Sequence, residues 1–281
     1  MWRIVPIYML FGWIVGCNET PRPTAPDQAS EEELSHWVEC LDTVNSVYDP
    51  LVEKIAEFGE PVVPLLIEKL NHPRHITALA AAWVFRRMGK EETLPQLLSA
   101  YDTTGSRFAL MAIGMILEDH PEFCRKSLEG EVDLDKQVMF QEMLEWVVLE
   151  EPPPGMEEGW TFPDCELYRA LGDSVVIVAQ RELGKGYRFS LPNKKVYILD
   201  DEEMQEWADE HGDYLYFRMR DMRIYDRSKE MAPLALFWFE MPWKVSRFSK
   251  HMYLSGGGVQ SLWRKHEGRW RFLTILVGWI S

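Results

Sequence analysis

The distribution of hydrophobic and polar residues changes twice along the chain. Residues 4–16 carry no charge at all. From residue 34 onward, apolar residues recur every three or four positions, beginning with Leu34, Trp37, Val38 and Leu41. This spacing is typical of one face of an amphipathic helix. After residue 174 the apolar residues form short runs and alternations that are typical of strands. The pattern predicts an uncharged leader, then a helical region, then a region with a β-sheet.

The leader has the layout of a secretory signal. One positive charge, Arg3, precedes the thirteen uncharged residues. As a helix these residues would reach about 20 Å at about 1.5 Å per residue. The hydrocarbon core of a bilayer is about 30 Å thick, so the segment is too short to span it comfortably. We therefore expect residues 1–16 to be a signal peptide.

The end of the leader carries a specific pattern, Ile14-Val15-Gly16-Cys17. It resembles the lipobox of bacterial lipoproteins, in which the Cys receives a diacylglyceryl group and the leader is cut just before it. The resemblance implies that Cys17 is the lipidation site. It also implies an exported protein held by acyl chains such as palmitate, on the periplasmic or extracellular face of the cell membrane or outer membrane. The alternatives are an ordinary secretory signal with a Cys at this place by chance, and an uncleaved anchor.

The segment after Cys17 is polar. Residues 18–30 contain three prolines and no large apolar residue, so they cannot bury enough surface to fold. Thirteen extended residues reach at most about 43 Å at about 3.3 Å each. We expect residues 17–30 to be a lipidated cysteine with a disordered tether.

Residues 59–117 contain an internal repeat with an offset of 31 residues. Pro64 matches Pro95 in the first helix of each copy, and Ala78 matches Ala109 in an Ala-rich second helix. The pattern is similar to the short HEAT-like repeats of the phycobilisome-lyase type. That resemblance implies a short α-solenoid over residues 31–150 that binds other proteins, and it brings no catalytic residues. The alternative is a plain helical bundle with chance self-similarity.

A Pro-rich linker at residues 151–159 separates this region from residues 160–281, because three successive prolines stop a helix. The last part combines several predicted strands with one helix that begins at Asp200. We predict an α+β domain with a curved antiparallel sheet and a covering helix, loosely similar to the NTF2-like fold. The strands at 234–239 and 272–277 are apolar on both faces, so we expect both to be central and the two domains to pack together.

Composition narrows the function classes. The net charge of −15 disfavours nucleic acid as a partner, since its phosphates select basic surfaces. Cys17, Cys40, Cys124 and Cys165 form no metal pattern. We therefore expect no cofactor and no metal site.

Candidate catalytic or ligating residues are few. Glu240 ends an apolar strand, and we expect it to reach solvent there rather than to act as a buried acid or base. His72 and His75 resemble a metal pair but lack a third ligand, and His251 and His266 read as solvated loop residues. The segment 256–258 is a bend or bulge rather than a phosphate loop. Core packing explains the many Trp residues of the C-terminal half better than stacking on a ligand.

The sequence favours a membrane-anchored lipoprotein that acts as a protein-binding scaffold in the cell envelope, with another envelope protein as partner. The alternative is a small-molecule-binding protein or an enzyme that uses an apolar pocket in the C-terminal α+β domain. No residue pattern points to a reaction.

Overall fold

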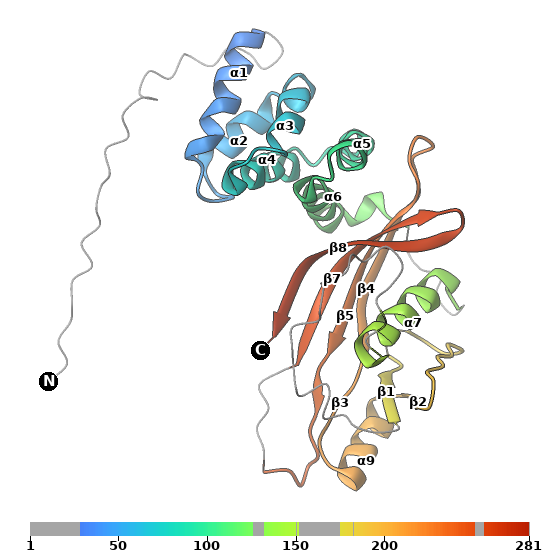
Figure 1. The fold of residues 1–281 in the computed structure, drawn as a ribbon. Helices are drawn as coiled ribbons and strands as arrows, with labels where there is room; N and C mark the ends of the chain where they lie inside the picture. Colours follow the sequence, from blue (N-terminus) through green and yellow to red (C-terminus); the bar gives the residue numbers. More distant parts are fainter. Residues whose placement is uncertain are drawn as a thin grey trace, which may run out of the picture. The chain divides into compact units, whose positions relative to one another are not determined.

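The computed structural model describes residues 29–125, 132–149, 151, 175–181, 183–250 and 256–280. The chain forms two compact units, one ending at Met88 and the other beginning at Gly89 (Figure 1). The predicted signal peptide, Cys17 and most of the tether lie outside the described residues, as does the linker from residue 152 onward. These assignments stay predictions.

The first unit is helical. Its elements are α1 (Glu31–Glu39), η2 (Cys40–Thr43), α2 (Pro50–Glu57), η3 (Glu60–Val62), α3 (Val63–Lys69) and α4 (His75–Met88). Ser30 caps the N-terminus of α1, and its hydroxyl accepts a hydrogen bond of 3.2 Å from the Glu33 amide. Helix α2 begins at Asp49, whose carboxylate accepts from the Leu51 amide at 3.0 Å, with Pro50 in the first helical position. In both helices, a polar side chain that accepts a hydrogen bond from a backbone amide of the first turn fixes the residue at which the helix begins.

The second unit opens with a repetition of the same elements. They are η4 (Glu91–Thr93), α5 (Leu94–Thr104), α6 (Arg107–Asp119) and η5 (Pro121–Phe123). Helix α3 starts at Val63 and α5 at Leu94, 31 residues later, and each carries Pro in its first turn. The secondary structure therefore follows the predicted repeat. The α-solenoid itself stays a prediction, because the two helix pairs belong to different compact units.

The rest of the second unit is a mixed α+β structure. Its elements are α7 (Leu134–Leu149), β1 (Val175–Ala179), β2 (Lys195–Leu199), α9 (Asp201–His211), β3 (Tyr214–Leu215), β4 (Arg218–Tyr225), β5 (Leu234–Met241), β6 (Trp243–Lys244), β7 (Gly257–His266) and β8 (Arg269–Ile280). The main sheet is antiparallel in the order β4-β5-β7-β8. The β7–β8 hairpin turns at Glu267 and Gly268, both with positive φ, a conformation that Gly adopts without strain.

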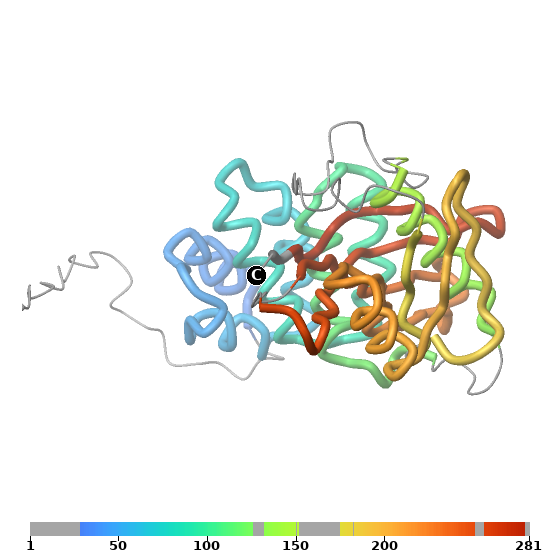
Figure 2. The backbone as a smooth tube through the Cα atoms, turned by 90° about the horizontal axis from the view of Figure 1, so that it is seen from below, coloured from blue at the N-terminus to red at the C-terminus, as the bar shows by residue number. Residues whose placement is uncertain are grey.

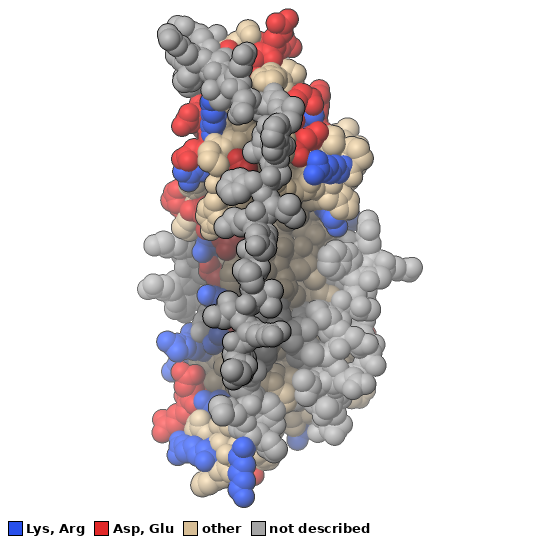
Figure 3. Space-filling view, turned by 90° about the vertical axis from the view of Figure 1, so that its left-hand side faces the viewer, with Lys and Arg blue, Asp and Glu red and all other residues tan. Residues whose placement is uncertain are grey.

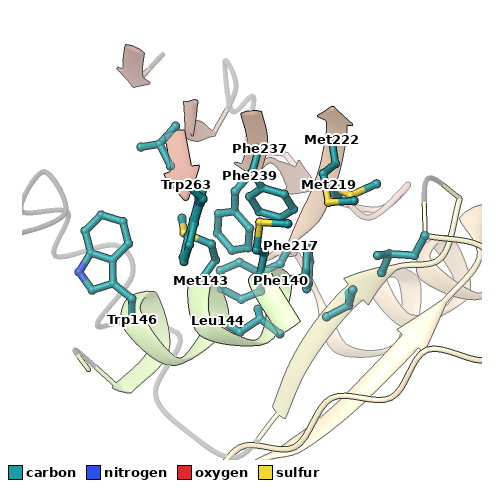
Figure 4. Packing of buried hydrophobic residues seen from close by; sticks show 14 of the residues in the cluster. Phe140, Met143, Leu144, Trp146, Phe217, Met219, Met222, Phe237, Phe239 and Trp263 are labelled. Carbon is teal, nitrogen blue, oxygen red and sulfur yellow. The ribbon is translucent and has the colours of Figure 1, made fainter. Parts of the chain in front are cut away.

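Helix α7 covers one face of the main sheet. Figures 1 and 2 show it alongside the strands in two perpendicular views. Its Phe140 packs on Phe237 and Phe239 of β5, with ring centroids 6.3 and 5.3 Å apart. Trp263 of β7 lies in the same buried cluster (Figure 4). The aromatic residues here are core residues, as expected.

The opposite face of the sheet is covered in part by α6, which contacts β5 and β8. At Gly114 of α6 a Cβ atom would lie 2.3 Å from the Leu276 side chain of β8, so the small residue permits this close approach. Leu234 and Leu236, which alternate with the residues facing α7, are buried as well. Helices α5 to α7 thus belong to the same compact unit as the sheet.

Two expectations about the sheet need correction. Strand β8 was expected to be central, but it is the last strand in the order, and Val277 is 50% exposed. Residues 273–276 are only half-buried, so the apolar run does not mark a strand that is covered on both faces. The helix expected to cover the sheet, α9, packs instead in a small separate cluster with β1 and β2. Strand β5 is central and buried, as predicted.

Candidate functional site

An ion-pair cluster holds the start of α7. Asp133 accepts hydrogen bonds from the amides of Asp135 and Lys136. The carboxylate of Asp135 binds Arg125 at 2.8 Å and Lys265 at 2.7 Å, and accepts from the Trp270 indole at 2.9 Å. Burial raises the pKa of Asp135, but these hydrogen bonds and charges outweigh it and hold the pKa below its ordinary value. The charges satisfy one another, so this cluster fastens α7 to the β7–β8 hairpin.

A second cluster, here called the polar row, lies on the sheet face away from α7. It consists of Arg218, Arg220, Trp238, Glu240 and Gln260. In β5 the side chains alternate, so Trp238 and Glu240 point away from the face that Phe237 and Phe239 present to α7. Trp238 is paired directly with Gln260 of β7, and Glu240 is paired with Arg218 of β4. Strand register therefore brings together residues from three strands.

Glu240 is buried, with 6% of its surface exposed. Its carboxylate accepts a hydrogen bond of 2.6 Å from Nε of Arg218, and it lies 3.4 Å from Nη1 of Arg220. The expectation that Glu240 reaches solvent is therefore wrong. The strand does end there, but β4 places an arginine directly opposite. Two guanidinium groups around one carboxylate leave the group with a net charge of about +1.

Arg220 lies over the ring of Trp238, with its Cζ atom 4.7 Å from the ring centroid. A guanidinium over an indole face is a stabilising cation–π arrangement. The Arg220 side chain is 58% exposed, so it also faces solvent. It is the member of the polar row best placed to meet a negatively charged group from outside.

Gln260 is the unusual member of the polar row. It is 1% exposed, and neither its amide nitrogen nor its amide oxygen has a hydrogen-bond partner. A buried polar group left without a partner costs about 1–3 kcal/mol. The sequence pattern did not single out Gln260. The available signal was a long, uncharged polar side chain between Val259 and Leu262, in the part of the strand that precedes its charged residues.

The other candidate residues do not gather into a site. Among the described residues, no group of His, Cys, Asp or Glu side chains could hold a metal ion, and His72 and His75 belong to none. The Gly256 backbone packs against the carbonyl of Met241, which leaves no room for a Cβ atom. Burial raises the pKa of the Cys124 thiol to about 11, so it stays protonated near neutral pH. His251 and Cys165 lie outside the described residues.

Figure 3 shows one face of the molecule by charge. Acidic and basic side chains are interspersed among the described residues on this face, and both signs occur at its lower end. This view therefore shows no large patch of a single sign among the described residues.

Comparison of the chain with protein families, with characterised proteins and with solved structures gives no match. In the part of the chain that the structure describes, no helix combines the length and the apolar character needed to cross a membrane.

Proposed function

We propose that this chain is a lipid-anchored protein of the bacterial cell envelope that binds another protein. The sequence Ile14-Val15-Gly16-Cys17 at the end of an uncharged stretch carries this proposal. The first helix begins at Glu31, so thirteen residues without a large apolar side chain lie between Cys17 and that helix. A tether of that length would let the folded units lie up to about 43 Å from the lipid surface.

Protein binding is the role we assign to the folded part. Pro-bearing and Ala-rich helices repeat at an offset of 31 residues in both sequence and secondary structure. Repeats of this kind usually present recognition surfaces to other proteins. We keep the HEAT-like assignment as part of the proposal.

The second candidate function is ligand binding by the C-terminal part of the chain. The alternative from the sequence is an apolar pocket in the C-terminal α+β domain. Packing disfavours such a pocket between α7 and the main sheet, since Phe140, Phe237, Phe239 and Trp263 pack together there (Figure 4). The polar row on the opposite face is the observation that favours a binding site there.

Lipidation can be tested by labelling. The chain with its own leader is expressed in a bacterium supplied with an alkyne analogue of palmitate. The wild type should carry the label and sediment with membranes, whereas Cys17→Ser should lose both properties. Cys40→Ser is the matched control and should keep both. Label that persists in Cys17→Ser would show that the anchor is elsewhere or absent.

A further inference from the structure

We infer that the polar row binds the C-terminal end of an extended peptide, through the Gln260 amide and the Arg220 guanidinium. This inference rests on the proposed function, because it names the kind of partner segment that the protein would recognise.

The Gln260 side chain supplies the first half of the recognition. A carboxamide offers two donors and one acceptor oxygen, and none of them is used within the protein. In an extended peptide, the backbone N–H and C=O of one residue point to the same edge of the peptide. Residues of neighbouring antiparallel strands use this arrangement when they exchange two hydrogen bonds. One residue of an extended peptide can therefore accept from the Gln260 nitrogen and donate to its oxygen.

Arg220 supplies the second half. Glu240 is already bound to Arg218 at 2.6 Å, and its contact to Arg220 is 3.4 Å, at the long end for a hydrogen bond. Arg220 is therefore loosely held and keeps most of its charge for a ligand. A carboxylate is the group that a guanidinium binds best, with two parallel hydrogen bonds. A peptide end carries that carboxylate next to the main-chain groups that Gln260 would bind.

Trp238 lies between Gln260 and Arg220, the two residues of the proposed binding site. It is paired directly with Gln260, which places the two Cβ atoms about 5 Å apart on the same face. Arg220 lies over the Trp238 ring, 4.7 Å from its centroid. Because Gln260 is 1% exposed, the Trp238 and Arg220 side chains must move aside when a peptide binds. The exposed Val277, opposite Gln260 on β8, adds apolar surface on the other side.

The test uses the full mature chain in detergent micelles and two probes, acetyl-alanyl-alanine and the same dipeptide with a C-terminal amide. Binding is measured by calorimetry, and the side-chain NH₂ signal of Gln260 is followed by NMR. Gln260→Met removes both polar groups while keeping the shape, and Arg220→Met removes the charge. Gln137→Met on α7 is the matched control, since Gln137 accepts one long hydrogen bond of 3.4 Å from the Arg188 amide.

We expect the wild type and Gln137→Met to bind the free-acid probe and to bind the amidated probe at least tenfold more weakly. Gln260→Met and Arg220→Met should each bind the free-acid probe at least tenfold more weakly, and the Gln260 NH₂ signal should shift on titration. The inference is overturned if the wild type does not bind the free-acid probe, or if Gln260→Met binds it as well as the wild type does. Labelling of Cys17 is measured in a separate experiment. A failure of peptide binding would therefore leave the proposed lipid anchor unaffected, and a failure of labelling would leave the peptide-binding result unaffected.

Discussion

Replacing Gln260 by Met should make the protein more stable. Substitutions in a buried strand usually destabilise a protein, so the expected sign is distinctive. The reason is that the Gln260 amide is 1% exposed and has no partner for its nitrogen or its oxygen. Met has a similar length and shape but no strong polar group, so it removes the penalty without opening a cavity.

The size of the gain follows from the two polar groups. Each costs about 1–3 kcal/mol when buried without a partner. Because a new side chain seldom packs ideally, we expect a net gain of about 1–3 kcal/mol in the free energy of unfolding. For a domain of this size, about 1 kcal/mol raises Tm by about 2–4 °C. Gln260→Met should therefore unfold between about 2 and 12 °C higher than the wild type.

Thermal and urea unfolding followed by circular dichroism would measure this change. The urea midpoint should rise while the slope m stays the same, since the surface exposed on unfolding does not change. Gln137→Met is the control and should not raise Tm, because Gln137 is partly exposed and already accepts a hydrogen bond. A lower Tm for Gln260→Met would show that the amide has a partner, such as a buried water, and would refute the reasoning.

Two further changes test the packing of α6 and the burial of a carboxylate on α7. Gly114→Val should destabilise the protein by about 1–3 kcal/mol through overpacking against Leu276, and urea unfolding should show a smaller loss in a Leu276→Ala background. Burial, with a contribution from the charge of Glu145, raises the pKa of Glu142 to about 7. The stability that the protonated Glu142 contributes is present below about pH 4.5 and is lost as the pH rises through about 7. Glu142→Gln should therefore exceed the wild type by about 1 kcal/mol at pH 8, after allowance for partial exposure, and the gap in unfolding free energy should close near pH 4. An equal gap at both pH values would contradict the assignment.

Features set by neighbouring residues could be predicted from the sequence. The capping box of α9 is an example, since Asp200 and Glu203 are three residues apart and bind each other's backbone amides. The starts of α1 and α2 and the β7–β8 turn are of the same kind. In each case the residues that form the cap or the turn are close in sequence, so a short segment of sequence is enough to predict it.

Features set by strand order could not be predicted in this way. The partner of Glu240 is Arg218, 22 residues earlier, and only the pairing of β4 with β5 brings them together. The apolar run in β8 predicted a central strand covered on both faces, but only the fold shows that β8 lies at the edge of the sheet, with residues 273–276 half-buried. The burial of the Gln260 amide without a hydrogen-bond partner depends on the positions of β5, β7 and β8 together. The polar row therefore became visible only in the fold.

The central claim is that acyl chains on Cys17 hold the protein at a membrane. Intact-mass spectrometry of the protein purified from bacterial membranes tests it most directly. We predict a chain that begins at residue 17 and carries the added mass of a diacylglyceryl group, with the extra mass confined to the first proteolytic peptide. A mature chain with an unmodified residue 17, or a chain that still carries residues 1–16, would contradict it.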